Sequence, residues 1–149
     1  MVQNPPEGTQ RVVPYLMYDD APAALEFLCR AFGCEERFRM PRPDGAVMHA
    51  EVGFQDSVVM LASNVEGSGT ASPRSLPARH GLVLCYVDDV DAHHERAVKA
   101  GAEIIAELQD QFYGDRSYGA RDPEGHHGYF ATHVRDVAPG DMHPPEGAA

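Results

Sequence analysis

The sequence predicts an α+β fold made of two tandem β-α-β-β-β modules, at residues 11–63 and 80–135. Three observations support this prediction. Each segment opens with an apolar run that ends in a pair of aspartates, beginning at Asp19 and at Asp88, 69 positions apart. A helical pattern of apolar residues follows each pair, and three strand-like runs follow each helix. The matching order indicates an internal duplication, with helices against mostly antiparallel sheets.

Each predicted element has its own local signal. In the first module, a strand at 12–18 precedes Asp20, whose carboxylate can accept hydrogen bonds from the first turn of a helix that ends at Gly33. In the second module, a strand at 82–87 precedes Asp89, and its helix ends at Gly101. The remaining strands are expected at 35–40, 45–54, 57–63, 103–108, 115–122 and 126–134.

Composition excludes several classes of protein. The formal net charge of −11 repels phosphate backbones and anionic lipid surfaces, so we expect neither nucleic acid nor a membrane as partner. No apolar run is long enough to span a bilayer, and the N-terminus does not resemble a signal peptide. We therefore expect a cytoplasmic protein with reduced thiols at Cys29, Cys34 and Cys85. Residues 64–79 are expected to form a flexible connector, with flexible tails at 1–10 and 136–149.

Several short sequence motifs carry a family resemblance. Residues 49–61, HAEVGFQDSVVML, resemble a hairpin of the PhnB-like proteins, and residues 13–21 resemble their opening strand. YGDRSYG at 113–119 and RDPEGH at 121–126 resemble their last hairpin. The chain thus resembles the vicinal oxygen chelate superfamily of glyoxalases, bleomycin-resistance proteins and extradiol dioxygenases. The resemblance implies a curled, cup-shaped mixed sheet with helices on its convex face, a ligand on the concave face, and a homodimer.

The same resemblance implies where a metal would bind. Metal-using members carry one ligand on the first and last strand of each module, positions that fall here on Val13, Met60, Leu82 and Tyr129. Valine and leucine offer no donor atom, and methionine prefers soft ions. We therefore expect no metal cofactor. A displaced divalent-metal site at His49, Glu51 and His127 is the weaker alternative.

Strand alternation selects the residues that face the cup. On the strand at 45–54, the apolar side chains of Met48, Ala50, Val52 and Phe54 alternate with His49 and Glu51. The apolar set should therefore pack on the helix, and the polar pair should face the cup. An apolar wall with a few polar groups suits a small organic molecule. The candidate ligand-binding residues are Tyr15, Met17, His49, Glu51, Met60, Leu84, Tyr86, His127 and Tyr129.

Two classes of function follow. The first is a metal-free protein that binds a small organic molecule in the cup. The second is an enzyme of the lyase, isomerase or dioxygenase type, with a rearranged metal site or with His49 and Glu51 as catalytic candidates, His49 acting as acid or base. A third possibility is a protein without a ligand, in which the cup residues only fill the interior. The connector is long enough to let two copies of a homodimer exchange modules.

Overall fold

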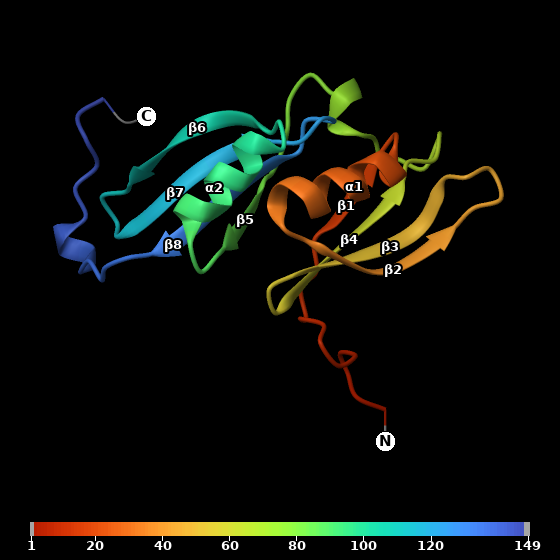
Figure 1. Cartoon of the computed structure of the whole chain (residues 1–149), viewed down its shortest axis with the longest axis horizontal. Coiled ribbons are helices and arrows are strands. Elements are labelled where there is room, and N and C mark those ends of the chain that lie inside the picture. Colours follow the sequence, from red (N-terminus) through yellow and green to blue (C-terminus); the bar gives the residue numbers. More distant parts are fainter. Residues whose placement is uncertain (1, 148–149) are drawn as a thin grey trace.

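The computed structural model describes residues 2–147, which form two modules of four strands and one helix (Figure 1). Met1, Ala148 and Ala149, at the ends of the expected tails, lie outside the described residues. The first module contains β1 (Tyr15–Tyr18), α1 (Ala21–Phe32), β2 (Glu35–Pro41), β3 (Val47–Phe54) and β4 (Ser57–Ser63). The second contains β5 (Val83–Tyr86), α2 (Val90–Lys99), β6 (Glu103–Asp110), β7 (Asp115–Arg121) and β8 (His127–His133).

The two sheets have the same topology. Their strand orders are β1-β4-β3-β2 and β5-β8-β7-β6. In each, the first strand pairs in parallel with the last, and the other neighbours are antiparallel. The predicted α+β class with tandem modules is confirmed, and the mixed sheets are curled without closing on themselves (Figure 1).

Helix α1 begins and ends at the predicted signals. The Asp20 side chain accepts a hydrogen bond from the Ala23 amide at 3.1 Å, and Gly33 ends the helix with φ of 73°. This left-handed backbone conformation costs little free energy in glycine, because glycine has no Cβ atom. One face of the helix is buried, through Ala21, Ala24, Leu25, Phe27, Leu28, Ala31 and Phe32.

Helix α2 departs from the predicted apolar face. Asp89 caps it as expected, and Val90 and Ala97 are buried, but Val98 is 49% exposed. His93 takes its place in the interior. Its Nε2 donates to the carbonyl oxygen of Phe32 at 2.9 Å, and its Nδ1 lies 2.7 Å from the Tyr118 hydroxyl. His93 therefore makes a contact between the two modules.

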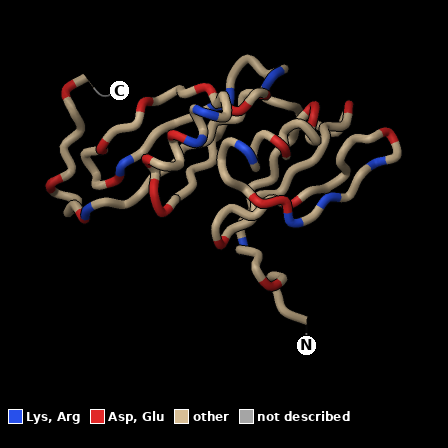
Figure 2. The backbone as a smooth tube through the Cα atoms, in the orientation of Figure 1, with Lys and Arg blue, Asp and Glu red and all other residues tan. Residues whose placement is uncertain are grey.

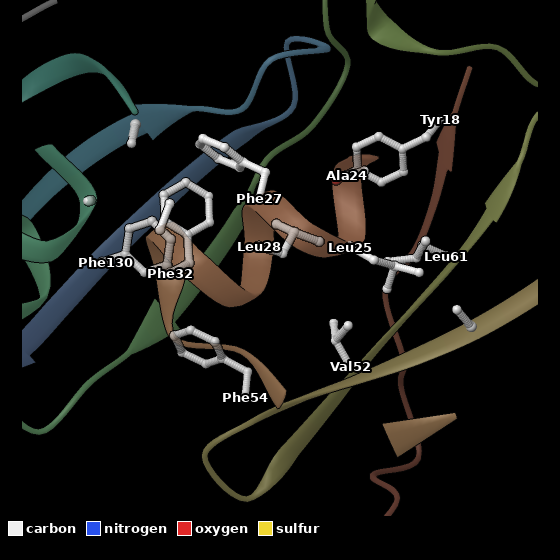
Figure 3. Packing of buried hydrophobic residues seen from close by; sticks show 14 of the residues in the cluster. Tyr18, Ala24, Leu25, Phe27, Leu28, Phe32, Val52, Phe54, Leu61 and Phe130 are labelled. Atoms are coloured by element: carbon white, nitrogen blue, oxygen red, sulfur yellow. The ribbon is translucent and has the colours of Figure 1, made fainter. Parts of the chain in front are cut away.

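The two modules share one core. Helices α1 and α2 pack together near the centre of the molecule, and the Phe32 ring of α1 lies 4.7 Å from the Phe130 ring of β8 (Figures 1 and 3). On β3, Ala50, Val52 and Phe54 are buried as predicted. Met48, predicted on the same face, is 54% exposed, and Val47 is buried instead, beside the irregularity of the β2–β3 register between Met40 and Pro41. Because the buried residues and the helices occupy one side of each sheet, the other side of each sheet is free of helices.

The β7–β8 turn joins the modules through two buried carboxylates. Glu124 is 4% exposed and accepts hydrogen bonds from the Asp19 and Asp20 amides and from the Ser72 hydroxyl. Asp122 accepts one from the Tyr18 hydroxyl at 2.7 Å. Ser72 belongs to the connector, which is therefore anchored at its middle instead of being flexible throughout.

Two further expectations concern the three cysteine thiols and membrane-spanning segments. Cys29, Cys34 and Cys85 form no disulfide, and burial raises the pKa of the Cys34 thiol to about 12, which disfavours the reactive thiolate. Within residues 2–147, neither helix has the length and apolar character needed to cross a membrane.

Candidate functional site

The helix-free face of the first sheet carries a row of four residues from its four strands. Tyr15 on β1 is paired in register with Met60 on β4, and Met60 with Glu51 on β3. Glu51 is paired in turn with Phe38 on β2. Register partners lie side by side on one face of a sheet. Three of the predicted ligand-binding residues are thus neighbours, together with Phe38.

A hydrogen-bonded chain crosses this row. The Tyr15 hydroxyl lies 2.7 Å from His49 Nδ1, and His49 Nε2 lies 3.1 Å from Glu51 Oε1. When the Glu51 carboxylate accepts from Nε2–H, Nδ1 is left to accept the Tyr15 proton. Burial of the phenol, and then the Glu51 charge, raise the pKa of Tyr15 above its usual 10.0, so the hydroxyl keeps its proton. Strand alternation predicted that His49 and Glu51 share a face, but it gave no sign of their link to Tyr15.

Apolar side chains next to this chain are open to solvent. Tyr15, Phe38 and Met40 are each more than two-fifths exposed. The Phe38 ring lies 6.0 Å from the His49 ring, and Met40 is paired in register with His49. Neither residue was predicted for the site, because β2 has charged residues around them and no clean alternation. Only the register with β3 brings them to the site.

The second sheet carries four of the predicted residues, Leu84, Tyr86, His127 and Tyr129. Leu84 on β5 is paired in register with Tyr129 on β8, and Tyr129 with Gly119 on β7. A Cβ atom at Gly119 would lie 3.0 Å from the Tyr129 ring, so the ring lies directly over this glycine. The Tyr86 hydroxyl donates to Asp115 at 2.8 Å, a partner that no sequence pattern predicted.

A cavity of about 860 Å³ lies where β1, β5 and the connector meet. Its volume falls in the usual range for a small organic ligand, about 300–1,000 Å³. Tyr15 and Met17 line it from the first module, and Leu82 and His127 from the second. Within residues 2–147, the shared cavity wall is the one link between the predicted ligand-binding residues of the two sheets. No hydrogen bond or ring contact in this part of the chain joins those of one sheet to those of the other. A second cavity, inside the shared core, measures only about 60 Å³ and is too small for such a molecule.

The residues at the expected metal positions do not fit a metal ion. Val13 lies before β1 and Leu82 before β5, so neither belongs to a strand, and their hydrocarbon side chains have no donor atom. Met60 and Tyr129 lie on the helix-free faces, but of two different sheets. The alternative set is also not assembled, because the described part of the chain holds no group of three or more His, Cys, Asp or Glu that could bind a metal. His127 lines the cavity, while His49 bonds to Tyr15 and Glu51.

Comparison with known proteins identifies the class to which this fold and site belong. The family model of the Glyoxalase/Bleomycin resistance protein/Dioxygenase superfamily matches residues 10–127. The chain therefore belongs to this superfamily.

Individual proteins are similar to this chain over most of its length. The uncharacterized protein Mb0911c of Mycobacterium bovis is 39% identical over 127 residues, which cover 83% of this chain and 84% of the relative. The crystal structure of TioX from Micromonospora sp. ML1 matches with a TM-score of 0.68 and 33% identity, covering 84% of this chain and 99% of TioX. The fosfomycin resistance protein FosX from Listeria monocytogenes matches with a TM-score of 0.62 at 15% identity, covering 90% of this chain and 98% of FosX, and shows the fold alone.

Proposed function

We propose that this chain is a cytoplasmic, PhnB-like member of the superfamily that binds a small organic molecule without a metal. The ligand occupies the cavity between β1 and β5 and contacts the helix-free faces beside it. Tyr15 belongs both to the cavity wall and to the Tyr15–His49–Glu51 chain. This shared position is the observation that carries the proposal, because it places fixed polar groups beside an apolar space of ligand size.

A homodimer is the second part of the proposal. Leu82, Leu84 and Tyr86 on the second module are each about half exposed, as are Tyr15 and Phe38 on the first. Exposed apolar patches of this kind mark binding surfaces in soluble proteins. A second copy that covers them would also exclude water from the ligand. Sedimentation at micromolar concentration should give twice the 16.2 kDa chain mass, and a monomer would contradict this part.

Ligand binding is tested with N-phenyl-1-naphthylamine, a neutral aromatic dye whose fluorescence rises in apolar sites. We expect saturable binding by the wild-type chain and about tenfold weaker binding by Tyr15→Ala, since loss of an aromatic contact is worth about 1.4 kcal/mol. Tyr113→Ala is the matched control, because Tyr113 is exposed in the β6–β7 turn and lines no cavity described above. No saturable binding, or equal loss in both variants, would contradict the proposal.

The metal-free state is tested separately. Protein purified without chelator is examined by elemental analysis and by thermal shift with Zn²⁺, Ni²⁺, Mn²⁺ and Fe²⁺. We expect no stoichiometric metal and no stabilisation. A bound metal that is lost in His49→Ala would overturn this part and favour the metal-dependent enzyme.

The enzyme alternative has one specific observation in its favour. In the Tyr15–His49–Glu51 chain, the carboxylate orients the imidazole so that Nδ1 can accept a proton passed through the phenol. A substrate proton next to Tyr15 could therefore reach His49. The Tyr15–His49–Glu51 hydrogen bonds are tested by nitrogen NMR of the His49 ring. The spectrum should show the Nε2–H tautomer in the wild type and a mixture of the two tautomers in Glu51→Gln. A mixture in the wild type would contradict this relay.

A further inference from the structure

The cavity between β1 and β5 differs in charge from the rest of the molecule. The chain has 23 acidic residues against 12 basic ones, and Figure 2 shows acidic positions along both modules. None of them lines this cavity. The charged or ionisable groups among its lining residues, apart from Tyr15, are Arg79, His80, His126 and His127. We propose that the cavity selects an organic anion, a molecule with an apolar body and one carboxylate or sulfonate group. This inference rests on the proposed function and specifies its ligand.

Arg79 is the main anion-binding group. Its Nε donates to the Gly125 carbonyl oxygen at 2.9 Å, which fixes the guanidinium against the β7–β8 turn. A Cβ atom at Gly125 would collide with this guanidinium, so glycine permits the close approach. Within residues 2–147, Arg79 has no ion pair, and its two Nη groups have no hydrogen-bond partner. They remain available to donate two parallel hydrogen bonds to a carboxylate or sulfonate.

The nearby carboxylates form no ion pair with Arg79 within residues 2–147. Asp122 and Glu124 lie in the same turn, but both are buried and hydrogen-bonded elsewhere. Asp122 accepts from the Tyr18 hydroxyl and from the amides of Glu124, Gly125 and His126. Glu124 accepts from two amides and the Ser72 hydroxyl. These donors satisfy the carboxylate oxygens, and the guanidinium is left for a ligand.

The histidines add donors around the same space. His126 Nε2 donates to the Met17 carbonyl oxygen at 2.9 Å, which fixes its ring at the edge of β1. The rings of His80 and His127 have no hydrogen-bond partner within the described residues, so a ring N–H of each is available to an anion. The apolar body of the ligand would contact the remaining wall, which includes Pro14, Tyr15, Leu76 and Leu82.

A pair of dyes with one ring system tests the charge preference. 1-Anilinonaphthalene-8-sulfonate differs from N-phenyl-1-naphthylamine by a sulfonate group. We expect the wild-type chain to bind the sulfonate at least tenfold more tightly, which is the effect of about one charge-assisted hydrogen bond. Arg79→Gln should remove most of this advantage, so it should weaken binding of the sulfonate much more than binding of the neutral dye. Arg79→Lys should retain part of it, since the charge remains without the two-pronged geometry.

The control is Arg74→Gln, because Arg74 is an exposed connector arginine outside this cavity and should leave both affinities unchanged. Urea unfolding of each variant separates loss of folding from loss of binding. If the neutral dye binds as well as the sulfonate, or if Arg79→Gln weakens both equally, the anion inference fails while the proposed function stands. If neither dye binds the folded wild type, the proposed function itself fails.

Discussion

Replacement of Glu124 by glutamine tests how the two modules are held together. The Glu124 carboxylate accepts from the Asp19 amide at 2.7 Å, from the Asp20 amide at 2.9 Å and from the Ser72 hydroxyl at 2.5 Å. Glu124→Gln keeps the size of the side chain but replaces one acceptor oxygen by an NH₂ group. At least one buried donor then loses its partner, at about 1–3 kcal/mol, and the others lose a charged acceptor.

We expect Glu124→Gln to lower the free energy of unfolding by about 3 kcal/mol, out of about 5–15 kcal/mol for a domain. The melting temperature should then fall by about 6–12 °C. Urea titration measures the change, with Glu107→Gln, on the exposed side of β6, as the control that should stay within about 0.5 kcal/mol. A loss below about 0.5 kcal/mol in Glu124→Gln would refute the reasoning that this turn joins the modules.

Two further predictions concern packing and pH. Gly119→Val should displace the Tyr129 ring and destabilise the fold by about 1–3 kcal/mol in urea titration, whereas Gly140→Ala, where a Cβ atom meets nothing within 4 Å, should have little effect. Burial lowers the pKa of His93 below 6.5, its usual value in an unfolded chain. As pH falls below about 6.5, the unfolded state therefore binds a proton at His93 more readily than the folded state, and the contribution of this histidine to the free energy of unfolding is lost. Unfolding of His93→Gln from pH 7.5 to 5.5 should show a shallower decline than the wild type, and an equal decline would contradict the assignment.

The fold was predictable because its signals are local. Asp20, Asp89 and Gly33 act on backbone groups within a few residues of themselves, and strand alternation needs no knowledge of the partner strand. The repeat of these signals along the chain was sufficient to predict two modules of the same topology. The inward position of Val52 and the outward position of Glu51 follow from the same alternation.

The site was only partly predictable because its contacts are made across strands and between modules. Alternation placed His49 and Glu51 on one face, but Tyr15 reaches His49 from a strand 34 positions earlier in the chain. Phe38 joins them only through the β2–β3 register, which is shifted by an irregularity between Glu36 and Phe38.

The sequence by itself determined the module order, the helix ends, the face of β3 that carries His49 and Glu51, and the lack of donor atoms at Val13 and Leu82. Only the tertiary structure decided that His93 packs between the modules, and that Arg79 is held beside the cavity by the turn at Gly125. The physical reason is range. Caps and alternation depend on neighbours along the chain, whereas a cavity wall depends on how two separately formed sheets pack around one core.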